Sequence, residues 1–436
     1  METIESGMVV PAEETPTHSI WLSNLDLLVA RSHTPTVYFY PPSAARPIGG
    51  FSFAVEALKA ALAKVLVPFY PLAGRIGLDP AGRVEIQCTG EGALFMVARS
   101  ASAMDDVLDD FAPSDTIRQM LVPSVESGNA PCPLVMVQVI LFKCGGVCLG
   151  VAVHHTAADG LGALHFVNSW SDIARGINVS APPSLDRTLL RARSPPTVLF
   201  DYVEYIQKPA AKPSTGKAPF DTAILKLSKE QLHLLKGRGG GKKGLSTFKA
   251  VTAHVWRSAC KARKLGGDQE TRLYMTADAR TRVKPPLPAG FVGNGIFRTS
   301  AVAKAGEILS NSLEFGADKI NDATVRLNDD YIRSLIDYLE LQRDVRGLQK
   351  GLWVIPGTDL WVISWLGLPI YEADFGWGKP AIMVRATLQF SGLVYIMHDS
   401  GVEGGLSLAV AMEPENMPLF KQVFYEELEA LKQSSA

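Results

Sequence analysis

A histidine and an aspartate stand four residues apart in the stretch His155-Thr-Ala-Ala-Asp159-Gly160. The histidine ends the apolar run VCLGVAVHH, and helical periodicity begins directly after the glycine. A strand end is therefore expected to present the imidazole just ahead of a helix. A neutral imidazole there can act as a general base, taking the proton from a hydroxyl or amine that attacks an acyl group. The alternative is a core histidine whose hydrogen bonds are satisfied, with Asp159 as a helix cap.

A second candidate is the glycine- and lysine-rich stretch GGGKKGLST at residues 239–247. Its glycines formally match GxGxxG, but they follow a helical pattern rather than a strand, so a dinucleotide-binding fold is not indicated. Lys242 and Lys243 precede Ser246 and Thr247 at the expected start of a helix, a setting that suits an anion such as phosphate. A solvated, charged loop is the alternative for this segment.

Other kinds of catalysis have little support in the sequence. A GxSxG nucleophile elbow and an activated Cys-His arrangement are not found. The cysteines are odd in number and widely scattered, which is typical of a reducing compartment. Cys144 and Cys148 flank a Gly-Gly turn without a second ligand pair nearby, so no metal site is expected. Direct transfer of an activated acyl group, without a covalent enzyme intermediate, remains.

The composition of the chain limits the class of protein to which these residues can belong. The chain has 436 residues, with 43 basic against 44 acidic side chains and 47% hydrophobic residues. This composition predicts a core-forming protein of two or three domains and argues against a nucleic-acid surface. The acidic opening METIESGMVV does not resemble a secretory signal, and Pro356 and Asp359 interrupt the most apolar region. A cytoplasmic protein without a membrane span is expected.

The elements expected around the histidine are a hairpin and two helices. The runs LVMVQVILF and VCLGVAVHH, joined by KCGG, predict an antiparallel hairpin. Apolar residues recur at helical spacing in SFAVEALKAALAKV before Pro68 and again after Gly160. The stretch 177–220 is rich in Pro, Ser and Ala and predicts a crossover rather than a packed element. We therefore expect domains at 1–180 and 221–436, joined by a linker at 181–220.

Taken together, these residues resemble the plant BAHD acyltransferases, which use acyl-CoA thioesters. HTAADG at 155–160 fits the HxxxDG signature of that family, and DFGWG at 374–378 matches its second signature without change. The similarity continues through PFYPLAGR, STFKAVTAHVWR and TRVKPPLPAGFVGN, so it covers essentially the whole chain.

The resemblance implies an α/β fold of two chloramphenicol-acetyltransferase-like domains, each a mixed sheet flanked by helices, with a channel between them. It makes His155 the general base and turns Asp159 away from the channel to pair with an arginine. Arg280 is the first choice for that arginine and Arg282 the second. DFGWG is assigned to the C-terminal domain, where it shapes the domain junction rather than touching substrate; its structural residues are Asp374, Gly376, Trp377 and Gly378.

The resemblance also implies acyl-CoA as a co-substrate and no permanently bound cofactor. Contacts to the CoA phosphates are expected from Lys242, Lys243, Ser246 and Thr247. The other partners expected are small molecules only, with no nucleic acid and no membrane insertion, and the enzyme is expected to be a monomer.

Within the family, the stretches RSHTPTVYFY and DLWVISWLGLPIYEADFGWG resemble the hydroxycinnamoyltransferases that make shikimate and quinate esters. Gly367 stands where that subgroup places an arginine that clamps the carboxylate of the acceptor, and Ile363 replaces a threonine. A desolvated carboxylate needs a bidentate cation, which glycine cannot provide. Residues expected to line the acyl and acceptor channel are His33, Thr36, Tyr38, Tyr40, Ile363 and Gly367.

The expected function is transfer of a p-coumaroyl, caffeoyl or feruloyl group from CoA to an acceptor without a carboxylate. An amine such as a polyamine, agmatine or an aryl monoamine comes first, since the absent arginine leaves room for a cationic acceptor. Trp365 is the candidate oxyanion donor or acceptor contact. The alternatives are an alcohol such as glycerol, shikimate or quinate, and a binding protein that has lost turnover.

Overall fold

The chain folds into two compact units in the computed structural model. The structure describes residues 1–42, 50–124, 132–179, 181–206, 219–237, 245–345, 347–348, 355–401 and 403–433, and only the backbone of residues 50–53. Unit 1 comprises Met1–Ala192, Pro285–Gly295 and Leu368–Thr387. Unit 2 comprises Arg193–Lys284, Ile296–Gly367 and Leu388–Ala436.

Unit 1 is built on a six-stranded mixed sheet of order β1-β6-β7-β8-β3-β13. β6 and β7 are parallel, and the other neighbours are antiparallel. A small sheet of order β2-β5-β4 accompanies it. The strands are β1 (Glu2–Val9), β2 (Ser19–Trp21), β3 (His33–Tyr40), β4 (Arg75–Leu78), β5 (Val84–Gln87), β6 (Ala93–Ser100), β7 (Val135–Phe142), β8 (Val147–His154) and β13 (Ile382–Arg385).

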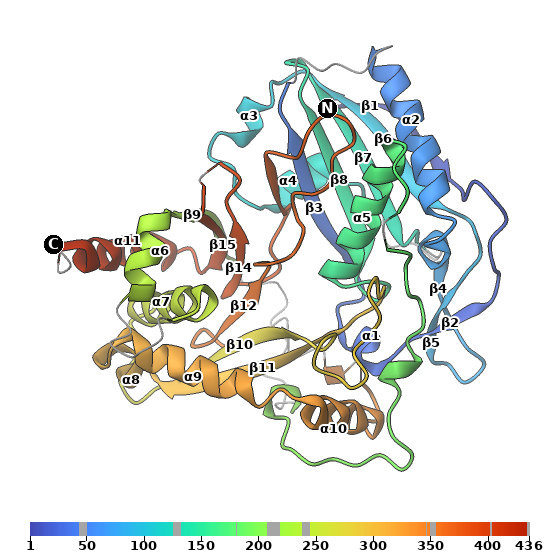
Figure 1. Cartoon of the computed structure of the whole chain (residues 1–436). Helices are drawn as coiled ribbons and strands as arrows, with labels where there is room; N and C mark the ends of the chain where they lie inside the picture. The colour runs from blue at the N-terminus through green and yellow to red at the C-terminus, as the bar shows by residue number, and fades with distance from the viewer. Residues whose placement is uncertain are drawn as a thin grey trace. The chain divides into compact units, whose positions relative to one another are not determined.

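Two long helices cover one face of this sheet, α2 (Gly50–Val65) and α5 (Gly160–Ala174). Figure 1 shows them side by side, and Nε1 of Trp170 on α5 donates to the carbonyl of Leu58 on α2 at 3.0 Å. Short helices complete the unit: α1 (Asn24–Leu28), η1 (Tyr70–Ala73), α3 (Asp105–Leu108), α4 (Asp115–Leu121) and η2 (Thr188–Leu190).

The predicted hairpin is confirmed as β7 and β8. Val135 pairs with Val153 and Leu141 with Val147, across the Gly-containing turn. Both strands are buried on both faces for nearly their whole length, which explains why their sequences are continuous apolar runs rather than alternating ones. These central strands provide a rigid base for the loop that follows β8.

Two expectations about domain organisation differ from the structure. DFGWG lies in unit 1, not in the C-terminal domain, because the following strand β13 pairs antiparallel with β3. The stretch 181–206 is not a bare linker, because it contains η2 and η3 (Val203–Tyr205) and the buried side chains of Arg187, Leu190 and Tyr205. The proline content of this stretch predicts a crossover but does not reveal which of its side chains are buried.

Unit 2 contains a second six-stranded mixed sheet, of order β11-β10-β12-β14-β15-β9. β12 is parallel to both of its neighbours, β10 and β14, and the other pairs are antiparallel. The strands are β9 (Asp221–Leu227), β10 (Glu270–Asp278), β11 (Ile296–Lys304), β12 (Leu360–Ser364), β14 (Leu393–His398) and β15 (Leu406–Met412).

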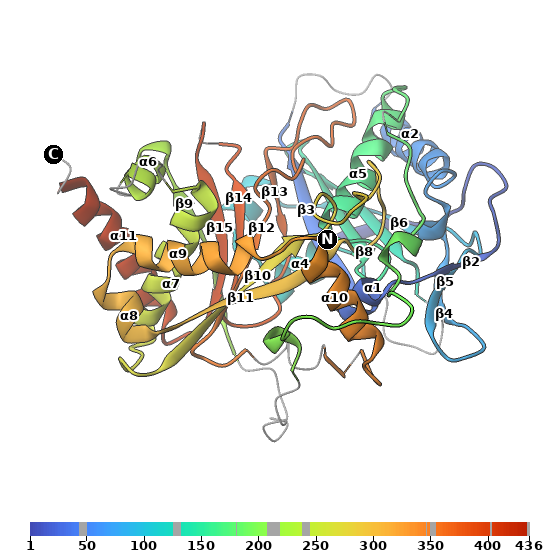
Figure 2. The same ribbon diagram turned by 60° about the horizontal axis from the view of Figure 1, so that its bottom comes forward.

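The helices of unit 2 bury one face of its sheet. α6, α7, α9 and α11 lie together along that face in Figure 2, and the core between them and the strands includes Trp256 of α7 and Phe420 of α11. Each unit is thus a mixed sheet flanked by helices, as expected. The helices are α6 (Lys229–Gly237), α7 (Thr247–Ala262), α8 (Ala305–Ser310), α9 (Leu313–Val325), α10 (Asp329–Glu340) and α11 (Met417–Gln433).

Candidate active site around His155

His155 lies directly after β8, where the sequence places it. Its backbone N–H donates to the carbonyl of Ser32 at 3.0 Å, which continues the pairing of β8 with β3 by one residue. The side chain is half-buried, and its Nδ1 atom is buried without a hydrogen bond within the described residues. The strand pair therefore fixes the backbone of His155, and one of its two ring nitrogens, Nδ1, is buried.

Asp159 is held by backbone N–H groups on two sides. As the N-cap of α5 it accepts from the N–H of Gly162 at 3.0 Å through Oδ1, and its Oδ2 accepts from the N–H of Gly295 at 3.0 Å. The residue is 1% exposed, so these charge-assisted bonds are made away from water. The bond to Gly162 agrees with the alternative in which Asp159 is a helix cap. Arg280 belongs to unit 2, where its Nη1 lies 3.3 Å from Oδ1 of Asp278, and its pairing with Asp159 stays a prediction.

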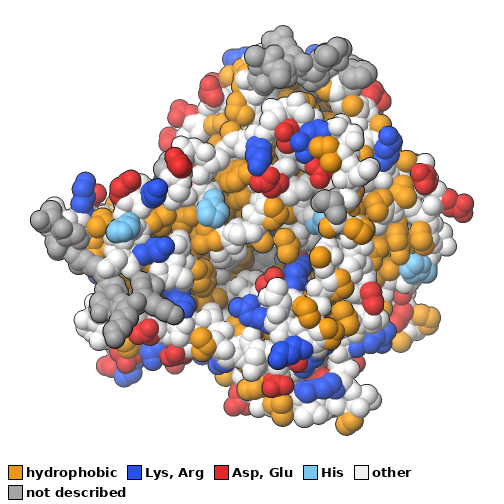
Figure 3. Space-filling model, viewed as in Figure 1, with side chains coloured by type: hydrophobic (Ala, Val, Ile, Leu, Met, Phe, Trp, Pro, Cys, Tyr) orange, Lys and Arg blue, Asp and Glu red, His pale blue; other side chains and the backbone are white. Residues whose placement is uncertain are grey.

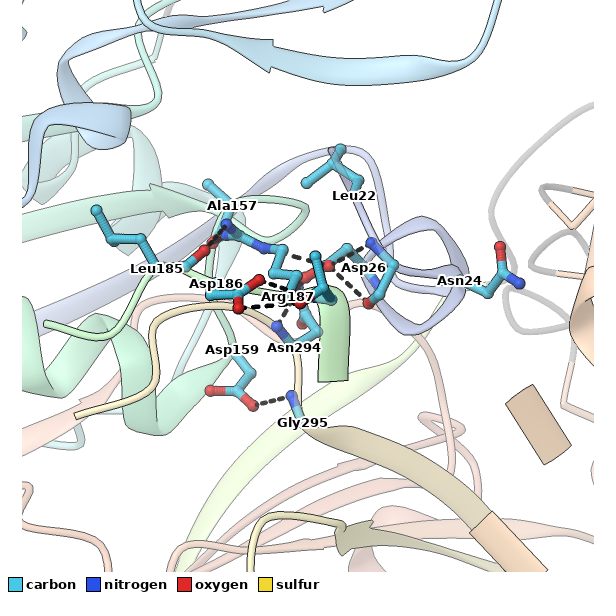
Figure 4. A network of polar contacts seen from close by, with 12 residues as sticks. Leu22, Asn24, Asp26, Ala157, Asp159, Leu185, Asp186, Arg187, Asn294 and Gly295 are labelled. Atoms are coloured by element: carbon cyan, nitrogen blue, oxygen red, sulfur yellow. Dashed lines mark hydrogen bonds and ion pairs between the residues drawn. The ribbon is translucent and has the colours of Figure 1, made fainter. Parts of the chain in front are cut away.

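A polar network joins this loop to three other places in unit 1 (Figure 4). Nδ2 of Asn294 donates to the carbonyl of His155 at 2.8 Å, and the backbone N–H of Asn294 donates to Oδ1 of Asp26 at 2.7 Å. Arg187 donates from Nη2 to the carbonyl of Ala157 at 2.8 Å, and its Nε lies 3.3 Å from Oδ2 of Asp26. The amide orientation of Asn294 is the one that satisfies both of its acceptors.

Sequence reasoning missed Asp26, Arg187 and Asn294. A signal for one of them was present, because Ser23 and Asp26 form a capping box at the start of α1, recognisable as Ser-x-x-Asp. Arg187 and Asn294 carried no such local pattern. Their roles arise from contacts with residues that are distant in the chain. Asn294, for example, contacts His155, which is more than a hundred positions away. Spacing along the sequence does not reveal such contacts.

The environment of His155 favours its neutral form. Burial lowers the pKa of His155, the nearby Asp159 carboxylate raises it, and the buried guanidinium of Arg385 lowers it. The pKa of the neighbouring His154 is lowered to about 3 by burial and by the charges of His33, His155 and Arg31. A neutral imidazole is the form that can accept a proton, so these shifts keep a base available below the ordinary pKa of about 6.5.

Replacing Arg385 with glutamine is expected to raise the pKa of His155, because a positive charge that disfavours imidazolium is removed. NMR titration of the histidine ring carbons measures this, with His155→Ala assigning the resonance. Asp159 opposes Arg385 in the wild type, and the pKa of the adjacent His154 is lowered by burial, by His33, by His155 and by Arg31. Arg31→Gln is the control, since its charge lowers the pKa of His154. An unchanged or lowered pKa of His155 in Arg385→Gln would contradict the prediction.

The DFGWG segment forms a closed turn. Oδ1 of Asp374 accepts from the N–H groups of Gly376 at 2.8 Å and Gly378 at 3.0 Å. Both glycines have φ near +90°, a conformation that favours glycine. The ring of Trp377 lies 5.3 Å from that of Tyr40, edge to face, and Phe375 packs against Trp170 of α5. The segment therefore joins the end of β3 to α5 through aromatic contacts.

The channel residues predicted on β3 differ in what they can offer a ligand. His33 is half-buried, and its Nε2 lies 2.7 Å from the carbonyl of Pro133. Thr36 donates to the carbonyl of Val151 at 3.3 Å, and Tyr40 donates to the carbonyl of Ala373 at 2.7 Å. Burial raises the pKa of both Tyr38 and Tyr40, so neither phenol ionises near neutral pH. Tyr40 acts as a support of the DFGWG turn.

The remaining predicted site residues belong to unit 2 and are described within it. Trp365 follows β12 with its ring 5.1 Å from that of Tyr395, and Ile363 is a half-buried residue of β12. Ser246 caps α7, accepting from the N–H of Lys249 at 3.3 Å, and Thr247 is the first residue of that helix. Lys242 and Lys243 lie outside the described residues.

Gly367 has a φ of +81° and is exposed in the turn after β12. A left-handed backbone favours glycine over any residue with a Cβ atom, at roughly 1 to 2 kcal/mol for most side chains. The absence of arginine here has therefore a backbone reason beside the acceptor reason that the sequence suggests.

On the face in Figure 3, basic and acidic side chains are interspersed over the surface. Within the described part of the chain, His, Cys, Asp and Glu side chains do not gather in threes that could hold a metal ion. Helices of the described segments are all too short or too polar to cross a bilayer.

Comparison with known proteins identifies relatives along the whole chain. A model described as "Transferase family" matches residues 1–427. Putrescine hydroxycinnamoyltransferase 1 of Oryza sativa subsp. japonica is 57% identical, over 98% of this chain and 99% of that protein. Shikimate O-hydroxycinnamoyltransferase of Nicotiana tabacum is 44% identical, over 98% and 99%. Among solved structures, vinorine synthase covers 96% of both chains with a TM-score of 0.77 at 24% identity, which bears on the fold alone.

Proposed function

The chain belongs to this transferase family, the BAHD acyl-CoA-dependent acyltransferases, and from that premise we propose that it transfers a hydroxycinnamoyl group from CoA to an amine. The product is a hydroxycinnamic acid amide. The observation that carries the acceptor class is the 57% identity to a protein named for putrescine, against 44% to one named for shikimate. The absence of a guanidinium at Gly367 agrees with an acceptor that has no carboxylate.

The chemistry proceeds through His155 as general base. The amine attacks the thioester carbonyl of the acyl-CoA while Nε2 of His155 takes its proton. The carbonyl oxygen becomes a tetrahedral oxyanion, for which Trp365 is the proposed donor or contact. Collapse of the intermediate breaks the C–S bond, and the proton on His155 passes to the departing CoA thiolate. No bond to the enzyme forms in this sequence.

Acyl-CoA serves as a co-substrate rather than a resident cofactor. We assign contacts to its phosphates to Lys242, Lys243, Ser246 and Thr247, since the amino end of α7 offers N–H groups and a favourable helix dipole. We further propose a monomeric, cytoplasmic enzyme. Its formal net charge of -1 provides no excess of basic residues for a nucleic-acid partner.

A competition assay tests the acceptor. p-Coumaroyl-CoA is offered with pooled putrescine, spermidine, agmatine, tyramine, tryptamine, glycerol, shikimate and quinate, and the products are detected by mass. We expect an amide of one of the amines to dominate. A coumaroyl ester of shikimate, quinate or glycerol as the main product would overturn the amine proposal while leaving acyl transfer intact. Caffeoyl-CoA and feruloyl-CoA in parallel reactions rank the donors.

A pair of substitutions at Gly367 separates charge from backbone strain. Asn tolerates the left-handed conformation, so Gly367→Asn keeps the turn without adding charge. Gly367→Arg adds both a Cβ atom and a guanidinium. Relative to Gly367→Asn, we expect Gly367→Arg to lower kcat/KM for the best amine by about tenfold or more, because the added guanidinium repels a cationic acceptor. Equal values for both variants would mean that the charge at this position does not select the acceptor.

A further inference from the structure

Asp26 is the centre of the network that reaches the His155 loop (Figure 4). Its Oδ1 accepts from the backbone N–H and from Nδ2 of Asn294, at 2.7 and 3.0 Å. Its Oδ2 accepts from the N–H and the hydroxyl of Ser23, at 2.9 and 2.7 Å, and lies 3.3 Å from Nε of Arg187. The side chains of Asp26 and Arg187 are 0% and 1% exposed. The carboxylate therefore uses its full capacity to accept hydrogen bonds, away from water.

Two arms extend from Asp26 to the loop between β8 and α5. Asn294 holds the carbonyl of His155, and Arg187 holds the carbonyl of Ala157, each at 2.8 Å. The end of the loop is fixed separately by Asp159, whose N–H donates to the carbonyl of Gly293 at 3.3 Å. The backbone of the candidate base is therefore held from three sides. Because the Cα–Cβ direction of a residue follows from its backbone, these contacts determine where the imidazole points.

Stability alone is a weak reason for such an ion pair. Removing two charges from water costs several kcal/mol per ion, and well-packed apolar residues often stabilise a fold as well or better. What an ionic network adds is a defined geometry, here between three segments that are distant in the chain. A shift of about 1 Å in a reacting group can cost about a hundredfold in rate. The network can therefore keep the backbone of His155 in a fixed position.

We propose that Asp26 is a positioning residue for acyl transfer, acting on His155 through Asn294 and Arg187 without touching substrate. This inference rests on the proposed function, in which His155 is the base. It predicts that loss of the Asp26 charge disturbs the chemical step rather than the binding of acyl-CoA.

Asp26→Asn is the primary test. The substitution keeps the size of the side chain but removes the negative charge opposite Arg187. It also places an NH₂ group, which donates hydrogen bonds, against groups that are themselves donors. We expect kcat to fall by about ten- to a hundredfold, with KM for p-coumaroyl-CoA and the Kd of CoA changed by less than about twofold. Rates are measured well below the Tm of the weakest variant and are normalised to the concentration of sites that bind CoA.

The chain offers a matched control in the buried Asp337 of unit 2. Its carboxylate lies 2.6 Å from Nε of Arg193 and accepts from the N–H of Thr197 at 2.7 Å, so it binds the segment 193–197. Asp337→Asn is expected to lower Tm to a similar extent while leaving kcat within about twofold. If Asp26→Asn also lowers Tm and leaves kcat within about twofold, or if its loss appears only in KM, the positioning role is overturned.

Asn294→Ala provides a second route if Asp26→Asn does not fold. It removes one arm and keeps the Asp26–Arg187 pair, and we expect the same pattern of a lower kcat at constant KM. Where both variants fold, the double variant is expected to lose less than the sum of the two logarithmic effects, since they act on one contact chain. Full additivity would contradict the chain of contacts. If His155→Ala leaves the rate unchanged, the proposed function fails instead, whatever Asp26→Asn does.

Discussion

Replacing His155 with alanine is expected to lower kcat with p-coumaroyl-CoA and the best amine by about two to four powers of ten. The imidazole is kept neutral by burial and by Arg385, and it lies at the end of a rigid strand pair. Without it, the attacking amine must lose its proton to water. Release of the CoA thiol, followed with a thiol reagent, measures the rate.

The matched control for this experiment is His18→Ala. His18 also belongs to unit 1, but it is exposed, with its Nε2 3.2 Å from the hydroxyl of Tyr70, and its loss should leave kcat unchanged. KM for acyl-CoA should remain similar in both variants. A rate for His155→Ala within a few fold of wild type would remove His155 from the role of base. It would then favour the alternative of a core histidine whose hydrogen bonds are satisfied.

Replacing Asp159 with alanine is expected to destabilise unit 1 by about 3 to 5 kcal/mol. The change removes two charge-assisted hydrogen bonds, leaves the N–H of Gly295 buried without its acceptor and uncaps α5. For a unit of this size, the loss corresponds to a fall in Tm of roughly 6 to 20 °C. Differential scanning calorimetry measures it in the presence and absence of CoA.

The variant Ser114→Ala measures how much of the lost stability is expected from the loss of a helix cap alone. Ser114 caps α4 in the same unit, accepting from the N–H of Ile117 at 3.1 Å, and its loss should cost about 1 kcal/mol. A loss for Asp159→Ala no larger than that for Ser114→Ala would show that Asp159 is an ordinary helix cap. The expected larger loss would support its role as the residue that anchors the catalytic loop to Gly295.

The sequence predicted the local elements near the site well, because short-range patterns specify them. The hairpin of β7 and β8 follows from two apolar runs around a glycine turn, and α5 from the periodicity after Gly160. The glycines of DFGWG, which the sequence assigned a structural role, adopt left-handed conformations that only glycine takes easily. These features depend on residues within a few positions of one another.

Long-range partners could not be predicted in the same way. Asp26, Arg187 and Asn294 are far apart in the chain. Asp26 and Arg187 both belong to the segment Met1–Ala192 of unit 1, and Asn294 meets them from the separate segment Pro285–Gly295. The assignment of DFGWG to the C-terminal domain failed for the same reason, since β13 returns to pair with β3. Proximity of this kind depends on strand pairing between distant residues.

The sequence by itself determined the family, the acyl-CoA chemistry and the two residues of the HxxxDG signature, because these rest on residue types at fixed short spacings. Only the tertiary structure decided how that signature is held. It assigned Asp159 to the N–H groups of Gly162 and Gly295, and it placed buried Asp26 and Arg187 behind the loop. Burial and hydrogen-bond partners are properties of the folded chain, since both are set by segments that meet only on folding.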